Sequence, residues 1–187
     1  MTSLQKDTGI NLLWLDLEMT GLEPSIDRIL EVAAIATRSD LEHLGEYESS
    51  VLQEEKLIRD LLQNNEFARN RPAETEALIQ TSLNGTALAQ IEDDLLNLIA
   101  THFGDEEVYL AGNSIHADRG FIKQWWPRLH KRLHYRMLDI SSFKLWWIGS
   151  GRFPYVKKEL HTALSDINES IAEFKFYLKD IEKSNES

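Results

Sequence analysis

The segment Asn11–Glu18 (NLLWLDLE) is apolar on both faces apart from two carboxylates near its end. A strand that is covered on one face only alternates polar and apolar side chains, whereas a strand covered on both faces reads as a continuous apolar run. The residues Thr20–Pro24 (TGLEP) then supply a turn. The chain is therefore expected to fold around a central buried strand.

Further elements follow this strand in a recognisable order. Two more strands are expected, Ile29–Thr37 and the more polar Glu42–Leu52, and with the first they suggest an antiparallel meander. A short strand is expected at Val108–Ala111. Helical patterns cover 74–81, 87–103, 118–126 and 140–147, and a last helix carries an apolar stripe of Leu164, Ile167, Ile171, Phe174 and Leu178. Strands first, then helices with one further strand between them, predict a mixed-sheet α/β fold.

The 187 residues contain no repeat, linker or low-complexity tract, which predicts one domain over residues 1–187. A short polar lead (1–10) and a polar, frayed tail (180–187) are expected at its ends. The chain has no cysteine, no apolar run near the roughly 20 residues that span a bilayer, and no secretory signal at its N-terminus. These features predict a cytoplasmic protein without a membrane partner.

The formal net charge of −11 and the pI near 5.0 argue against binding of long nucleic acid, which relies on Lys and Arg to neutralise phosphates. An acidic chain can still bind a short anion, or collect metal cations in an acidic pocket. A soluble surface without functional meaning explains the same charge equally well.

The pair Asp16 and Glu18 is the first candidate site. Side chains alternate along a strand, so both carboxylates lie on one face together with Leu12 and Trp14. Two adjacent carboxylates in an apolar strand resist desolvation and repel each other. Either they lie at a frayed strand end in water, or they bind a divalent cation such as Mg²⁺ or Mn²⁺.

Two further candidate positions occur later in the chain. Asp118 follows the strand at 108–111, where sites in open α/β sheets collect, although an acid in the first turn of a helix is also favoured by the helix dipole. His161 and Asp166 are five residues apart and would not share a face of one helix. We therefore expect His161 on the preceding loop, Thr162 as the N-cap and Asp166 inside the helix.

Four stretches of the sequence contain these separate candidate residues and link them to one another: WLDLEMTGLEPSIDRILEVA (14–33), GNSIHADRGF (112–121), HYRMLDISS (134–142) and ELHTALSDINESIAE (159–173). In this order and with these contexts, the chain resembles the DEDDh exonucleases of the RNase H-like superfamily, most closely the oligoribonuclease family. The resemblance runs from about residue 11 to residue 178. It implies an RNase H-like mixed five-stranded sheet flanked by helices.

The resemblance also implies a catalytic centre. Two divalent metal ions, Mg²⁺ or Mn²⁺, would be held on either side of the scissile phosphate, one activating a water and the other stabilising the leaving 3′-oxygen. The implied metal ligands are Asp16, Glu18, Asp118 and Asp166. His161 would be the general base, because an imidazole titrates close to neutral pH.

Substrate-binding residues are implied in the same way. Leu22 would wedge against the bases, and Ser114 would lie near the 5′ phosphate. Tyr135 and Arg136 match residues that reach into the partner's active site in the family's homodimer, where the arginine could bind a terminal phosphate and the tyrosine could stack on a base. A capped 5′ phosphate leaves no path for a long strand, so short oligonucleotides and dinucleotides are the expected substrates.

The expected homodimer has a second motivation in two adjacent tryptophan pairs, Trp125–Trp126 and Trp146–Trp147. Aromatic residues are enriched at interfaces, but tryptophans that simply fill the core explain the pairs equally well.

The sequence departs from the family where a tryptophan is typically followed five residues later by a histidine. Phe67 and Pro72 occupy those places; Phe67 can still stack, but the proline side chain offers no hydrogen bond. The stretch from Trp146 to Leu160 is also poorly matched. The first expectation is a metal-dependent 3′→5′ exoribonuclease acting on very short oligoribonucleotides. The alternatives are a dinucleotide phosphodiesterase that prefers DNA, and a catalytically silent nucleotide-binding module.

Overall fold

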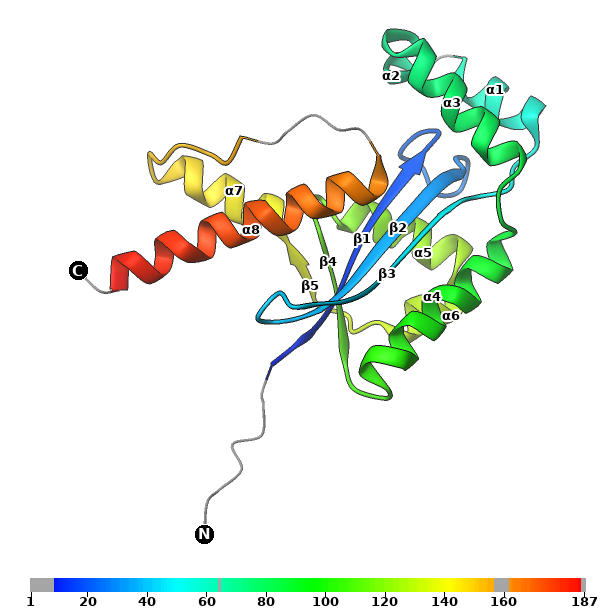
Figure 1. The fold of residues 1–187 in the computed structure, drawn as a ribbon. Coiled ribbons are helices and arrows are strands. Elements are labelled where there is room, and N and C mark those ends of the chain that lie inside the picture. Colours follow the sequence, from blue (N-terminus) through cyan, green and yellow to red (C-terminus); the bar gives the residue numbers. More distant parts are fainter. Residues whose placement is uncertain (1–8, 64, 157–161, 186–187) are drawn as a thin grey trace.

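A five-stranded mixed sheet forms the centre of the molecule, as Figure 1 shows. The computed structural model describes residues 9–63, 65–156 and 162–185. The strands are β1 (Asn11–Met19), β2 (Ile29–Arg38), β3 (His43–Ser50), β4 (Val108–Gly112) and β5 (Met137–Asp139), in the order β3-β2-β1-β4-β5. The first three are antiparallel, and β1, β4 and β5 are parallel. The predicted central strand, meander and mixed sheet are confirmed.

Helices cover both faces of this sheet and explain why β1 is apolar throughout (Figure 1). Leu13, Leu15 and Leu17 pack into the core beneath α4 (Leu88–Phe103), α5 (His116–Trp125) and α6 (Pro127–Arg132). Leu12 and Trp14 point to the other face, beneath α7 (Ile140–Gly149) and α8 (Ala163–Asn185). The carboxylates of β1 share this second face, because side chains alternate along the strand.

Three short helices form a separate unit beyond the carboxyl end of β1 (Figure 1). They are α1 (Glu55–Leu62), α2 (Glu66–Asn70) and α3 (Pro72–Leu83), and they share a small apolar core with Leu30 of β2. Pro72 is the first residue of α3, a position where the missing backbone N–H has no helical partner to lose. This unit forms one wall of the site described below.

Several elements differ from the sequence prediction. The helices α1, α2 and α6 have five to eight residues, and β5 has three, too few for a periodic pattern to stand out. Helix α8 continues to Asn185, so residues 180–185 are helical rather than a frayed tail. The predicted N-terminal lead falls mostly on residues 1–8, which lie outside the described residues.

Two of the four paired tryptophans fill the core. Trp126 and Trp147 are buried in the two main core clusters, as a core-filling role predicts. Trp146 is 57% exposed, and Trp125 is partly buried with the guanidinium of Arg28 4.7 Å from its ring centroid. None of the described helices is long and apolar enough to cross a membrane.

Candidate active site

Three carboxylates converge where β1 ends against the start of α8. Asp16 and Glu18 project from β1, and Asp166 projects from the first turn of α8. One oxygen from each carboxylate lies within 4.8 Å of the other two. These are three of the four carboxylates that the family resemblance implies, and the face assignment along β1 is confirmed.

The start of α8 is fixed by a reciprocal cap. The backbone N–H of Ser165 donates to Oγ1 of Thr162 at 3.3 Å, and the N–H of Thr162 donates to Oγ of Ser165 at 3.1 Å. The predicted N-cap role of Thr162 is therefore confirmed. Because the cap satisfies N–H groups that have no partner within the helix, it fixes where the helix begins and so where Asp166 lies.

Asp118 lies in the first turn of α5 and is buried, with 6% of its surface exposed. Its Oδ1 accepts a hydrogen bond from the backbone N–H of Leu17 at 3.1 Å. This bond ties the carboxylate to β1 between Asp16 and Glu18. Both sequence explanations of Asp118 thus hold at once: it is a first-turn acid, and it lies beside the carboxylate group.

The electrostatics of these residues favour a bound cation. Burial, reinforced by the nearby charges of Glu31 and Asp166, raises the pKa of Glu18 to about 7. Burial also raises the pKa of Asp118 to about 7, with the charge of Glu18 adding to the effect and the Leu17 hydrogen bond opposing it. The donors are all carboxylate oxygens, the ligands that hard divalent cations prefer. The residues present therefore fit divalent metal binding.

Glu31 is a further carboxylate at the site that the sequence did not single out. It pairs with Glu18 across β1 and β2, and its Oε1 accepts a hydrogen bond from the N–H of Ala163 at 3.2 Å. Burial raises its pKa, and that hydrogen bond opposes the rise. Glu31 therefore links the sheet to the start of α8. The sequence shows Glu31 within the stretch RILEVA (28–33), but its position opposite Glu18 depends on the register between β1 and β2.

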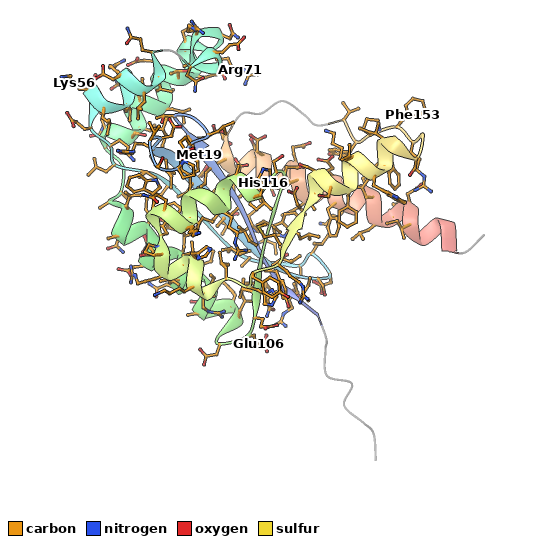
Figure 2. All side chains as sticks on the ribbon, turned by 180° about the vertical axis from the view of Figure 1, so that it is seen from behind. Met19, Lys56, Arg71, Glu106, His116 and Phe153 are labelled. Carbon is orange, nitrogen blue, oxygen red and sulfur yellow. The ribbon has the colours of Figure 1, made fainter. Side chains whose placement is uncertain are left out.

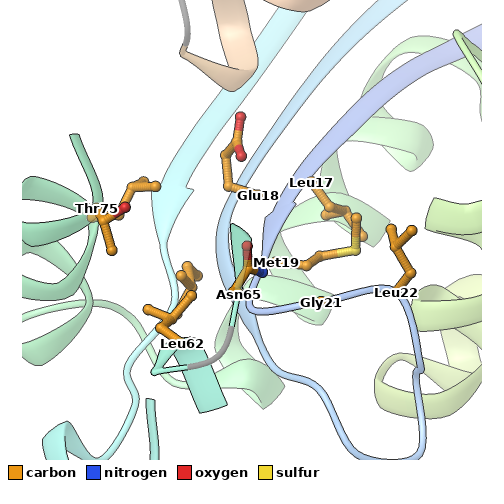
Figure 3. Close-up of a pocket in the computed structure, with 10 residues that line it drawn as sticks. Leu17, Glu18, Met19, Gly21, Leu22, Leu62, Asn65 and Thr75 are labelled. Carbon is orange, nitrogen blue, oxygen red and sulfur yellow. The ribbon is translucent and has the colours of Figure 1, made fainter. Parts of the chain in front are cut away.

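A groove of about 340 Å³ opens beside Glu18 toward the α1–α3 unit. Figure 3 shows Leu22 and Thr75 on opposite sides of this groove, with Glu18 between them. Leu22 is 80% exposed, which for a leucine leaves a large apolar surface free for contact. The other lining residues are mostly apolar: Leu17, Met19, Gly21, Leu30, Leu62, Asn65 and Leu78. The groove suits a flat apolar ring such as a nucleobase.

A second groove, of about 300 Å³, lies on the other side of Glu18. Its wall includes Asp166, Thr162 and Glu31 from the site, and Arg71 and Glu74 from the α1–α3 unit. Nε of Arg71 lies 3.9 Å from Oε2 of Glu74. The two grooves therefore meet at the carboxylate group.

Ser114 follows β4 in a left-handed backbone conformation, with φ of 50°. Its N–H lies 2.8 Å from Oγ of Ser141 and 3.0 Å from Oδ1 of Asp139, and the two serine oxygens are 3.1 Å apart. Oγ of Ser141 donates to Oδ1 of Asn113, whose amide donates to Oγ of Ser170 in α8 at 2.8 Å. Ser114 is thus connected to the helix that carries Asp166. Ser141 was missed, although it lies in the matched stretch HYRMLDISS.

Tyr135 and Arg136 do not join the carboxylates of their own chain. They precede β5, which runs parallel to β1 and β4, so they lie near the end of the sheet opposite Glu18. Figure 2 shows the two ends through the labelled Met19 and Glu106. The Tyr135 ring, 68% exposed, lies 4.5 Å from the His134 ring and 4.8 Å from the Arg136 guanidinium. A contact with an active site would therefore need a second chain.

Two predicted residues remain without a described side chain. His161 lies outside the described residues, and Phe67 lies in α2 with a side chain that is likewise outside them. The side chain of His116, in the first turn of α5, is 72% exposed, with Nδ1 3.6 Å from Oδ2 of Asp139. The roles of His161 and Phe67 stay predictions.

Comparison with known proteins shows which protein family this chain resembles. Residues 13–174 match the exonuclease family RNase_T. The oligoribonuclease of Chromobacterium violaceum is 36% identical, with 93% of this chain and 96% of the relative covered. The oligoribonuclease of Neisseria meningitidis is 39% identical over 89% and 90% of the two chains.

Solved structures agree on the fold. Exonuclease I of Methylocaldum szegediense has a TM-score of 0.59 at 16% identity over 87% of this chain. Exonuclease I of E. coli, in complex with a dT13 oligonucleotide, has a TM-score of 0.60 at 12% identity over 89% of this chain. The chain spans 39% and 40% of those longer proteins, which share its RNase H-like fold. With the exonuclease family matched over residues 13–174 and oligoribonuclease relatives matched over nearly its whole length, the chain belongs to the oligoribonuclease family of exonucleases.

Proposed function

We propose that this chain is a metal-dependent 3′→5′ exoribonuclease that degrades very short oligoribonucleotides, down to dinucleotides, to nucleoside 5′-monophosphates. The observation that carries the proposal is the convergence of Asp16, Glu18 and Asp166 within 4.8 Å, with Asp118 tied to the backbone between the first two. A catalytically silent module would have no need to keep three partly buried carboxylates and the buried Asp118 together at such a cost.

Four carboxylates would hold two divalent ions, Mg²⁺ or Mn²⁺: Asp16, Glu18, Asp118 and Asp166. When bound, such ions supply Lewis acidity that activates water and stabilises the negative charge developing on the leaving 3′-oxygen. The protein contributes rigidity to this arrangement. Asp118 is buried and hydrogen-bonded to Leu17, and Asp166 lies behind the capped start of α8.

His161 is proposed as the general base. Its position directly before the N-cap Thr162 places it in sequence next to the turn that carries Asp166. A ring nitrogen of the neutral imidazole would take the proton of the attacking water, and the ordinary histidine pKa near 6.5 suits this step at neutral pH.

The substrate would lie across the two grooves. Leu22, exposed at the edge of the first groove, is suited to wedge between bases, and Phe67 on α2 would stack on one of them. Ser114, with Ser141 beside it, would bind the 5′ phosphate through its hydroxyl group. A capped 5′ end restricts the substrate to a few nucleotides, and an acidic protein gains little from a longer polyanion.

The active unit is proposed to be a homodimer in the cytoplasm. Tyr135 and Arg136 are exposed, stacked on each other and far from the carboxylates of their own chain, so they are free to complete a partner's site. Their aromatic and guanidinium groups suit a base and a terminal phosphate.

The second candidate function is a dinucleotide phosphodiesterase that prefers DNA. It is favoured by one observation: Phe67 and Pro72 stand where the family typically has a tryptophan and a histidine, and Pro72 begins α3 without a polar side chain to offer. The metal chemistry would be the same in both cases.

Turnover of pApA and pdApdA by the wild-type protein, with Mn²⁺ and with a chelator, tests both functions. Metal-dependent release of AMP from pApA at the higher kcat/KM supports the proposal, whereas a preference for pdApdA supports the second candidate. The Asp166→Ala protein is the matched control, and more than a tenth of wild-type turnover in it would contradict the site assignment. Absence of turnover on both substrates would refute the proposed function.

A further inference from the structure

The charged side chains that line the two grooves are mostly negative, which disfavours the binding of a nucleotide phosphate. Among the described residues that line them, four are carboxylates, namely Glu18, Glu31, Glu74 and Asp166, and a single residue, Arg71, carries a positive charge. A phosphate that enters this region meets strong repulsion wherever bound cations do not compensate for the carboxylates.

Arg71 occupies a defined place in this wall. It is the N-cap of α3, directly before Pro72, and it lines the second groove together with Glu18 and Asp166. Its Nε lies 3.9 Å from Oε2 of Glu74, one helical turn further on, and its side chain is 36% exposed. Figure 2 shows Arg71 on the outer part of the α1–α3 unit.

We propose that Arg71 binds the phosphate of the nucleotide held at the carboxylate group, and that it binds the nucleoside 5′-monophosphate product more tightly than the diester substrate. The inference rests on the proposed function, because that activity turns the scissile phosphate into the 5′ phosphate of the product. It assigns a binding role to a residue that lies in none of the four stretches carrying the family resemblance.

The preference for product follows from the change in charge. Hydrolysis adds water across the bond between phosphorus and the 3′-oxygen, and the leaving oxygen ends as a hydroxyl. A phosphodiester carries one negative charge, whereas a phosphate monoester carries about 1.5 to 2 near pH 7 and has three terminal oxygens. A guanidinium can donate two parallel hydrogen bonds to such a group, which an ammonium cannot match in geometry.

Glu74 makes the opposite contribution in the same groove. Its carboxylate repels the product phosphate and competes with it for Arg71. Neutralising Glu74 should therefore tighten binding of the monophosphate, while neutralising Arg71 should weaken it. This pair of opposite signs is specific to a phosphate ligand, since a loss of folding would weaken binding in both variants.

The test is calorimetric titration of 5′-AMP and of adenosine into the full-length protein with Mg²⁺ present. For Arg71→Gln the dissociation constant of AMP should rise about tenfold, the lower range for a charge-assisted contact that is partly exposed to solvent. Adenosine, which lacks the phosphate, should bind unchanged. Arg71→Lys should be intermediate, and Glu74→Gln should bind AMP several-fold more tightly. Arg69→Gln is the control, because Arg69 lies two residues away and lines neither groove.

Two outcomes would overturn the inference: AMP affinity that is unchanged in Arg71→Gln, or an equal loss of affinity for AMP and adenosine, which would indicate a structural role. Wild-type protein that binds no AMP would overturn it as well. The proposed function fails separately, through absence of dinucleotide turnover in the wild-type protein. Unchanged AMP affinity in an Arg71→Gln protein, beside an active wild type, would reject the role of Arg71 and leave the enzyme activity standing.

Discussion

Replacing Glu18 with glutamine should stabilise the metal-free protein while it removes metal-dependent activity. Burial, with help from Glu31 and Asp166, raises the pKa of Glu18 from 4.5 to about 7. In the unfolded chain the carboxyl group ionises near 4.5, so between these two values the folded state binds more protons. Without metal, the raised pKa of Glu18 therefore contributes to the free energy of unfolding in full below about pH 4.5, and this contribution is lost as the pH rises through about 7.

The size of this loss follows from the shift. A rise of 2.5 pKa units corresponds to about 3–4 kcal/mol, at about 1.4 kcal/mol per unit, and relaxation of neighbouring side chains makes this an upper value. Glutamine has nearly the same shape and no charge, so the variant avoids that cost at pH 8. Part of the pH dependence should remain, because burial raises the pKa of Asp118 as well.

Urea unfolding followed by circular dichroism at pH 5 and pH 8 in a chelator measures the effect. Between the two pH values we expect the wild-type protein to lose about 2–3 kcal/mol more stability than Glu18→Gln, which is the contribution of the Glu18 carboxyl group alone. Added Mn²⁺ at pH 8 should restore the wild-type protein but stabilise the variant far less. Glu42→Gln, at an exposed position, is the control and should follow the wild type. An equal loss in Glu18→Gln and wild type would refute the reasoning.

Three further predictions concern catalysis and assembly. His161→Ala should lower kcat by about 10²–10⁴ while metal binding, followed by calorimetry, is kept; a pH–rate profile like that of the wild type would reassign the base. Activity per 3′ end should fall sharply beyond a few nucleotides, and the affinity should fall only shallowly with salt because few phosphates are neutralised; complete digestion of a 20-mer at equal enzyme would contradict this. Mixing Tyr135→Ala and Asp16→Ala subunits should restore at most about half of the activity per dimer. If subunit exchange is demonstrated and no activity returns, Tyr135 does not act in a partner's site.

The sequence was most informative where a local rule applied. Alternation along a strand placed Asp16 and Glu18 on one face with Leu12 and Trp14, and the structure confirms that face. The apolar stripe beginning at Leu164 predicted α8, and the hydroxyl of Thr162 at its start caps it. Each of these conclusions depends only on residues that are close in sequence.

Other features could not be read locally. The strand β5 has three residues, so no period was available to reveal it, and the sequence reached five strands only through the family resemblance. The length of α8 was underestimated because its last residues, 179–185, are mainly polar and lack the apolar stripe by which the helix was recognised.

The sequence alone thus determined that Asp16 and Glu18 share one face of β1 and that Asp166 lies just inside a helix capped by Thr162. Tertiary structure decided which residues meet: the register that sets Glu31 opposite Glu18, the contact of Asp118 with Leu17, and the groove that brings Arg71 to Asp166. The physical reason is the separation along the sequence over which each effect acts. Backbone geometry fixes the direction of a side chain within a few residues, whereas the approach of groups about 100 residues apart is fixed by how the sheet and helices pack around a shared core.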